Sequence, residues 1–109
     1  MWCSWYTGYM QVRKYRWSRV YESAEEELVA LLERRAIAAQ RHAAEEGEAI
    51  PGKTYLADTQ LWCAEGQVAC TIAGRTYSVQ AGDVLDIPAN TPCHMQLSFG
   101  GCVWYESIA

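Results

Sequence analysis

Apolar residues in the second half of the chain fall into short runs, and glycine, proline or asparagine separates most runs from the next. The runs span residues 60–65, 67–73, 76–80, 84–87, 94–99 and 102–107. Short β-type runs at regular spacing, with turn residues between them, are typical of an antiparallel sandwich or barrel. Residues 10–20 also alternate well enough to predict a strand, although Val12 interrupts the alternation.

One helix is predicted ahead of these runs. Ser23 is a good N-cap, and Glu26 three residues later completes a capping box. The leucines that follow share one face, and acidic residues crowd the first turn, where the helix dipole favours them. These signals predict a helix over residues 23–35. Residues 36–46 also have high helix propensity, so local sequence alone leaves the end of the helix open.

The composition fits one folded domain. The chain has 109 residues, half of them hydrophobic, which is enough for a modest core. Its formal net charge of −4 argues against a broad phosphate-binding surface. A basic segment at residues 13–19 interleaves four cations with Tyr15 and Trp17, a pattern that can contact single-stranded nucleic acid. Because the rest of the chain is acidic, we interpret it as a strand with a solvated cationic face and expect no nucleic-acid partner.

The sequence shows no sign of a membrane or secretory destination. No window reaches the roughly 18 apolar residues that span a bilayer, and the first residues lack the regions of a signal peptide. The five cysteines are odd in number and contain no CxxC pair, which indicates reduced thiols. We therefore expect a cytoplasmic protein with no membrane partner. Residues 1–9 are predicted to be an extension or a partner-contacting arm ahead of a single domain at 10–109.

The segment WCAEGQVACTIAGRTYSVQAGDVLDIPANTPCH resembles the small single-domain cupins. In that family a strand ends in a glycine turn, a hairpin follows, and a segment with a Gly-Asp pair and a later proline closes the barrel. Gly66, Gly74, Gly82 with Asp83, and Pro88 fall in that order. The resemblance covers residues 50–107 and implies a mainly β fold, the cupin-type double-stranded β-helix or jelly-roll barrel, with one N-terminal α-helix.

The resemblance also indicates where the helix ends, which the helix propensity of residues 36–46 left open. Family members run a strand into the barrel edge at the place of residues 37–44. We therefore end the helix near Arg35 and expect the barrel to extend over about 37–107.

The same resemblance implies where metal ligands would lie. Cupin metal sites use two histidines and a glutamate from one motif and a histidine from a second. At the corresponding positions this chain has Lys53, Tyr55, Thr59 and Cys93. Two histidines in the whole chain cannot supply a three-histidine zinc site. We therefore expect no metal and no other cofactor.

Counting in steps of two along the strands predicts the residues that face the barrel interior. This set consists of Lys53, Tyr55, Thr59, Leu61 and Cys93. Trp104 and Glu106 share a face of the last strand and are expected to close the pocket. Such an interior suits a small organic ligand with an anionic or hydroxyl group near Lys53. The alternative is a barrel filled by bulky side chains, with Lys53 in an exposed loop. Trp62 has the opposite parity and is expected on the outer face or at a dimer interface.

His94 and the cysteines leave two further alternatives open. His94 should point outward if Cys93 points inward, unless a bulge near Pro92 turns it into the barrel as an acid–base group. Cys63, Cys93 and His94 are conceivable as a soft site for zinc or copper(I). Against this, buried free cysteines commonly pack as small hydrophobes.

These observations favour a metal-free module that binds a small molecule in the barrel interior. The alternative is a small cupin enzyme of isomerase or dioxygenase type. It would use a Cys/His metal site or acid–base groups such as Lys53, Tyr55, His94 and Glu106. A third hypothesis is a structural role through self-association. Small cupins are often dimers, so we expect a homodimer.

Overall fold

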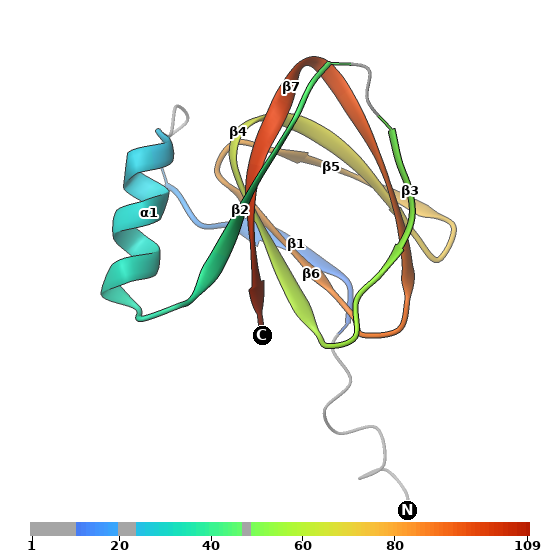
Figure 1. The fold of residues 1–109 in the computed structure, drawn as a ribbon, viewed down its shortest axis with the longest axis horizontal. Helices are drawn as coiled ribbons and strands as arrows, with labels where there is room; N and C mark the ends of the chain where they lie inside the picture. The colour runs from blue at the N-terminus through green and yellow to red at the C-terminus, as the bar shows by residue number, and fades with distance from the viewer. Residues whose placement is uncertain (1–10, 20–23, 47–48) are drawn as a thin grey trace, which may run out of the picture.

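The computed structural model describes residues 11–19, 24–46 and 49–109, in which strands wrap into a barrel and one helix lies against its outside (Figure 1). The elements are β1 (Arg13–Arg16), α1 (Glu25–Arg34), β2 (Ala39–Ala44), β3 (Ala49–Thr54), β4 (Thr59–Ile72), β5 (Arg75–Gln80), β6 (Asp83–Ile87) and β7 (Pro92–Ile108). The helix is too short to cross a membrane, and none of the described residues form a helix that could do so.

Two long strands form the frame of the barrel. β4 and β7 pair antiparallel from Thr59 opposite Ile108 to Ile72 opposite Cys93, with two shifts of register between. Each strand is continuous, whereas the sequence pattern predicted two separate strands in each region. The predicted breaks are bends at glycines: Gly66 and Gly101 have φ of 78° and 75°, and a side chain on Gly66 would meet the Gly101 carbonyl oxygen.

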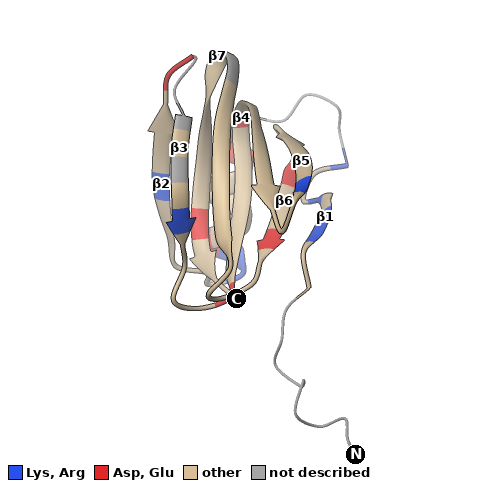
Figure 2. Cartoon of the chain, turned by 90° about the vertical axis from the view of Figure 1, so that its right-hand side faces the viewer, with Lys and Arg blue, Asp and Glu red and all other residues tan. Residues whose placement is uncertain are grey.

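The remaining strands attach to this frame. The order is β1-β6-β4-β7-β2, with β3 also paired to β7 and β5 to β4, and all pairs are antiparallel. Seen from the side, β2 and β3 lie on one side of the barrel and β1, β5 and β6 on the other (Figure 2). This confirms the predicted jelly-roll β fold with one helix.

The barrel interior is the main core. It holds alternate residues of β4 and β7, including the buried thiols of Cys63, Cys70, Cys93 and Cys102. Within each half of a long strand the buried residues are two apart, because such residues face the same side of the sheet, and the parity changes where the register shifts at the bends. These cysteines are thus free and packed among apolar side chains.

The helix runs from Glu25 to Arg34, within the predicted range of 23–35. Its N-cap is Ala24, whose side chain makes no capping hydrogen bond, and the predicted N-cap Ser23 lies outside the described residues. The helix ends one residue before the predicted end near Arg35. Ala36 adopts φ of 54°, and the amides of Ala36 and Ile37 bond back to Glu33 and Leu32, which forms a Schellman motif.

Beyond this stop the chain forms β2, which confirms the predicted strand at 37–44. Its residues have high helix propensity, but all six pair with β7. The ladder of hydrogen bonds to β7 outweighs an intrinsic preference of a few tenths of a kcal/mol per residue.

A second apolar cluster fixes α1 to the outer face of the sheet. Leu28 and Leu32 of the helix pack with Trp62, Ala64 and Val84. The Trp62 ring is 2% exposed, and its Nε1 donates to Ser107 Oγ at 2.9 Å. Trp62 therefore faces outward as predicted, but the chain's own helix covers it rather than a partner subunit.

Polar contacts add to this attachment. Glu25 accepts hydrogen bonds from Arg41 Nε at 2.6 Å and from the Tyr105 hydroxyl at 2.6 Å. These two bonds lower the pKa of Glu25. They join the first turn of α1 to β2 and β7.

Replacing Leu28 with alanine should lower the free energy of unfolding by about 2–5 kcal/mol, because it leaves a cavity against Trp62. Urea unfolding followed by tryptophan fluorescence measures this loss. Glu33→Ala, at an exposed position of the same helix, should change the value by less than about 0.5 kcal/mol. Equal effects of the two substitutions would show that the helix does not depend on this cluster.

Candidate functional site in the barrel interior

The polar centre of the interior is the carboxylate of Glu106 on β7, whose side chain is 11% exposed. Its Oε2 accepts hydrogen bonds from the Tyr55 hydroxyl at 2.8 Å and from Trp104 Nε1 at 2.9 Å. Trp104 lies two residues before Glu106 and therefore on the same face of the strand. Tyr55 reaches the carboxylate from just beyond the end of β3.

Lys53 brings a positive charge to this carboxylate. Its Nζ lies 3.4 Å from both Glu106 oxygens and 4.9 Å from the centre of the Tyr55 ring. The backbone of β3 sets this position through a shift of register between Ile50 and Lys53, where Gly52 has φ of 60°. Lys53 is consequently placed opposite Cys93 on β7.

His42 on β2 completes the cluster. It lies opposite Trp104 in the β2–β7 ladder, and the two rings stack with centroids 5.5 Å apart and planes 11° apart. Its Nε2 is 3.4 Å from Glu106 Oε1, yet this buried nitrogen makes no hydrogen bond with any described residue. We call Lys53, Tyr55, Trp104, Glu106 and His42 the Glu106 cluster.

The surroundings of Tyr55 in the folded protein raise the pKa of its hydroxyl. Burial raises the pKa well above its usual range, and the negative charge and hydrogen bond of Glu106 raise it further. Tyr55 therefore serves as a neutral donor to Glu106 rather than as a phenolate.

Cys93 lies beside the cluster and interacts with Cys70. The Cys70 contact lowers the pKa of Cys93 and the nearby Lys53 ammonium lowers it further, against the opposing effects of burial and Glu106. The same contact, together with burial, raises the pKa of Cys70. Of the two thiols, Cys93 is thus the one that ionises first.

The other predicted interior residues have apolar or structural roles. Leu61 is fully buried and lies opposite Glu106 in the β4–β7 ladder. Thr59 is also buried, but its hydroxyl donates to the Ala57 carbonyl at 2.9 Å. Among the predicted residues, Lys53, Tyr55 and Trp104 all contact Glu106, whereas the Thr59 hydroxyl bonds to the backbone.

His94 lies outside the barrel. It is exposed between the buried Cys93 and Met95, and its Nδ1 accepts a hydrogen bond from the Gly52 amide at 3.1 Å. The bulge in this region is in β3 and not at Pro92, so His94 keeps the outward parity that the strand gives it. His94 is therefore not part of the Glu106 cluster.

The conceivable soft-metal site of Cys63, Cys93 and His94 does not form. Cys63 contacts Cys102, Cys93 contacts Cys70, and His94 faces away. Across residues 11–19, 24–46 and 49–109, no group of three or more histidine, cysteine and acidic residues is placed to hold a metal ion.

Sequence reasoning missed His42. The residues that carry the cupin resemblance begin at about residue 50, so His42 fell outside the positions that were compared. The available signal was the predicted strand at 37–44, but the sequence did not indicate its partner strand or register.

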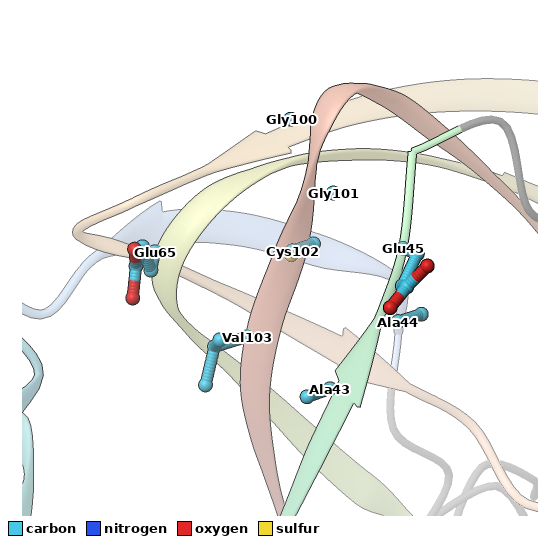
Figure 3. A pocket seen from close by; sticks show the side chains of 8 residues that line it. All are labelled: Ala43, Ala44, Glu45, Glu65, Gly100, Gly101, Cys102 and Val103. Carbon is cyan, nitrogen blue, oxygen red and sulfur yellow. The ribbon is translucent and has the colours of Figure 1, made fainter.

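A separate pocket of about 230 Å³ lies where β7 bends and β2 ends (Figure 3). It is lined by Ala43, Ala44, Glu45, Glu65, Gly100, Gly101, Cys102 and Val103. It does not include the residues of the Glu106 cluster.

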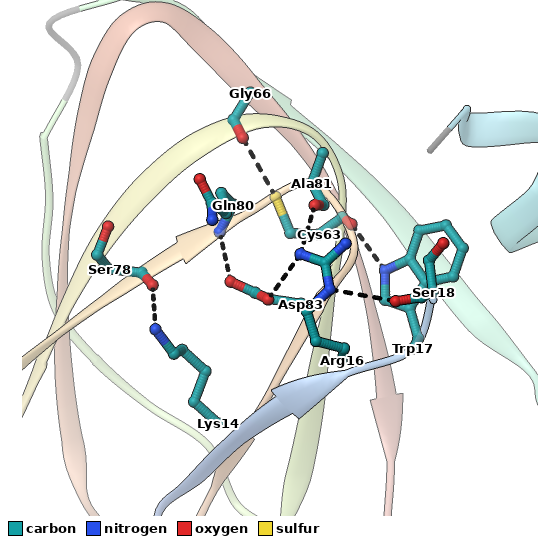
Figure 4. A network of polar contacts seen from close by, with 10 residues as sticks. All are labelled: Lys14, Arg16, Trp17, Ser18, Cys63, Gly66, Ser78, Gln80, Ala81 and Asp83. Atoms are coloured by element: carbon teal, nitrogen blue, oxygen red, sulfur yellow. Dashed lines mark hydrogen bonds and ion pairs between the residues drawn. The ribbon is translucent and has the colours of Figure 1, made fainter. Parts of the chain in front are cut away.

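The basic segment at 13–19 contacts the barrel itself (Figure 4). Arg16 forms an ion pair with Asp83 at 3.3 Å, and Lys14 Nζ donates to the Ser78 carbonyl at 3.0 Å. Trp17 Nε1 donates to the Cys63 carbonyl at 2.9 Å. These contacts give three residues of the segment structural roles.

The fold is similar to solved cupin structures. A cupin superfamily protein from Desulfitobacterium hafniense DCB-2 aligns with a TM-score of 0.61 at 15% identity, over 90% of this chain and 76% of that protein. A DUF861 family protein from Thermotoga maritima aligns with a TM-score of 0.62 at 15% identity, over 91% and 100% of the two chains.

A larger enzyme contains a similar unit. Salicylate 1,2-dioxygenase from Pseudoaminobacter salicylatoxidans, in complex with gentisate, aligns with a TM-score of 0.56 at 17% identity, over 77% of this chain and 30% of the enzyme. No family model and no curated protein matches the sequence. At these identities the similarity is one of fold, and it supports the cupin-type barrel.

Replacing Tyr55 with phenylalanine should change how stability depends on pH. The raised pKa means that the folded state favours neutral Tyr55. Tyr55 therefore contributes fully to the free energy of unfolding below a pH of about 10, the pKa of tyrosine in the unfolded chain. This contribution declines as the pH rises above that value. Tyr55→Phe should lose about 1–3 kcal/mol at neutral pH, through the missing hydrogen bond, and should show a shallower decline above about pH 10 than the wild type.

Chemical unfolding at a series of pH values measures both quantities. Tyr77→Phe, on β5 and outside the Glu106 cluster, is the matched control and should keep the wild-type slope. If Tyr55→Phe kept that slope as well, the folded state would not raise the pKa of Tyr55.

Proposed function

We propose that this chain is a cupin-fold module that binds a small organic hydroxy-carboxylate in the barrel interior, at the Glu106 cluster, without a transition metal. The observation that carries the proposal is the placement of Lys53. Its ammonium group points toward the Glu106 carboxylate, yet both of its contacts there are 3.4 Å long.

Lys53 has donor capacity left for a ligand. An ammonium group has three donors, and charge-assisted hydrogen bonds are typically about 2.7–2.9 Å long. The two contacts to Glu106 are longer, and 37% of the side chain is exposed. An incoming carboxylate would therefore gain a charge-assisted bond from Lys53 without breaking a short one.

Glu106 and His42 favour a hydroxyl group on the same ligand. Glu106 Oε2 already accepts two short hydrogen bonds, whereas Oε1 contacts Lys53 and His42 of the described residues at the longer distance of 3.4 Å. A hydroxyl between Oε1 and His42 Nε2 would donate to the carboxylate and accept from an Nε2–H of the imidazole. This would also give a hydrogen bond to a buried nitrogen that makes none with the described residues.

The surrounding side chains suit an apolar or ring-shaped body. Tyr55 and Trp104 contribute aromatic rings, and the buried Leu61 lies opposite Glu106. Ligand sites typically combine apolar walls with a few placed polar groups, which is the composition found here.

The side chains at the positions implied for metal ligands do not fit a divalent cation. A lysine ammonium has no lone pair, and Tyr55 is a neutral donor to Glu106. The Thr59 hydroxyl donates to a backbone carbonyl, which leaves Cys93 as a single thiol. These four side chains lack the imidazole and carboxylate donors that such ions usually take.

An acid–base enzyme is the second candidate. Lys53, Tyr55 and His42 all contact one carboxylate, and such clusters can move protons to and from a bound substrate. The metal-dependent form of this alternative has less support, because Cys63, Cys93 and His94 lie in separate places. A homodimer and a cytoplasmic location stay predictions from the sequence.

Salicylate is a suitable first probe, because it carries a carboxylate and a hydroxyl on one ring. A dioxygenase of that substrate also shares this fold. Isothermal titration calorimetry should detect binding to the wild type. Lys53→Met should weaken affinity about 10-fold or more, through loss of a charge-assisted bond. Lys14→Met, which removes a lysine whose ammonium group donates to the Ser78 carbonyl, is the control and should bind as the wild type does.

Two results would contradict this function. One is that no small hydroxy-carboxylate binds the wild type, and the other is that Lys53→Met binds salicylate as well as Lys14→Met does. Salicylamide, which lacks the carboxylate, should bind more weakly than salicylate.

Elemental analysis tests the absence of a metal. We expect purified protein, without added chelator, to contain far less than one transition-metal ion per chain. One equivalent of zinc, iron, manganese or copper would overturn the metal-free part of the proposal.

A further inference from the structure

Cys63 and Cys102 form a close pair of thiols inside the barrel. Their Sγ atoms are 3.6 Å apart, one on β4 and the other on β7, and both side chains are buried. A disulfide requires an S–S length of about 2.05 Å, so the two sulfurs must move closer together before the bond can form.

The surrounding structure holds Cys63 in place. Its carbonyl accepts a hydrogen bond from Trp17 Nε1 at 2.9 Å (Figure 4). The same carbonyl accepts a second hydrogen bond from the Gly82 amide at 3.0 Å. Its Sγ lies 3.7 Å from the Gly66 carbonyl oxygen. The thiol is thus anchored beside the bend of β4.

The neighbouring pocket gives a path to Cys102. Figure 3 shows Cys102 on β7 between Gly101 and Val103, with the end of β2 facing it. Cys102 is one of the residues that line this pocket of about 230 Å³. Cys70 and Cys93, by contrast, are fully buried and do not line the pocket.

The pocket also restricts which oxidant can enter. Its lining includes the exposed carboxylates of Glu45 and Glu65, which disfavour anions. Because only 4% of Cys102 is exposed, a compact reagent has better access than a bulky one. A small uncharged hydroperoxide meets both conditions.

We propose that Cys63 and Cys102 are an oxidation site, at which a small hydroperoxide converts the two thiols into a disulfide between β4 and β7. In the first step the Cys102 sulfur attacks a peroxide oxygen. The O–O bond breaks, the thiol proton leaves with the departing oxygen as water or alcohol, and Cys102 becomes a sulfenic acid. In the second step the Cys63 sulfur attacks Cys102 Sγ, the S–O bond breaks, and water leaves with the Cys63 proton.

The order of the two steps follows from position. Cys102 meets the pocket, whereas Cys63 lies behind it. Contact with Cys102 and burial raise the pKa of Cys63, which fits a thiol that reacts second. The overall reaction oxidises two thiols and reduces one hydroperoxide.

The disulfide would join residues that are 39 positions apart in sequence. It would also cross the part of the β4–β7 ladder where the register shifts. By restricting the unfolded chain it should raise the Tm by about 10 °C. The barrel would gain a covalent connection at its bend in response to peroxide.

Peptide mapping of the full chain tests this proposal. The reduced protein is treated with a modest excess of hydrogen peroxide, unfolded, alkylated and digested without reductant. Cleavage after Glu65 separates Cys63 from Cys70, and cleavage after Phe99 separates Cys93 from Cys102. The expected product is a linked pair of peptides containing Cys63 and Cys102, with Cys70 and Cys93 alkylated, and with a rise in Tm that dithiothreitol reverses.

Two variants sharpen the test. Cys63→Ala should leave Cys102 as a sulfenic acid that dimedone traps, whereas Cys70→Ala should still form the disulfide. The proposal is overturned if Cys63 and Cys102 are both alkylated after peroxide treatment. It is also overturned if Cys70 and Cys93 become linked first, or if Cys102 is oxidised to sulfinic acid with Cys63 still present.

Discussion

The antiparallel pairing of β4 with β7 is the constraint on which the rest of the structure depends. β5 and β6 bond directly to β4, β2 and β3 bond to β7, and β1 bonds to β6. Each long strand can serve two walls of the barrel because it bends at a glycine. A Cβ atom on Gly66 would clash with the Gly101 carbonyl oxygen, so the two backbones approach more closely than any other residue would permit.

This pairing also assembles the Glu106 cluster. The two halves of β7 hold different neighbours: β2 lies against the half that contains Glu106, and β3 lies against the half that contains Cys93. Bending β7 back across the barrel brings Lys53 from β3 and His42 from β2 to the same carboxylate. The site is thus a product of long-range strand pairing, and no short motif encodes it.

The dependence on long-range strand pairing explains which features could be predicted from the sequence and which could not. Alternation on a strand is local, so it correctly placed Leu61 inside and Trp62 outside, and it correctly put Trp104 and Glu106 on one face of the last strand. The end of the helix was also predictable, although only through the family resemblance, because residues 36–46 favour a helix locally. Strand pairing is not local, and the sequence therefore did not predict the contact of His42 with Glu106. For the same reason it did not predict that β4 and β7 continue through their glycine bends. What covers Trp62, the helix rather than a second subunit, depended on the same tertiary information.

A crystal structure of the protein soaked with salicylate is the sharpest test of a ligand site at the Glu106 cluster. We expect the carboxylate of the ligand within hydrogen-bond distance of Lys53 Nζ and its hydroxyl beside Glu106 Oε1, with the ring against Tyr55 and Trp104. An interior filled by side chains, with Lys53 and Glu106 in a short direct ion pair and the ligand absent or only on the surface, would contradict it.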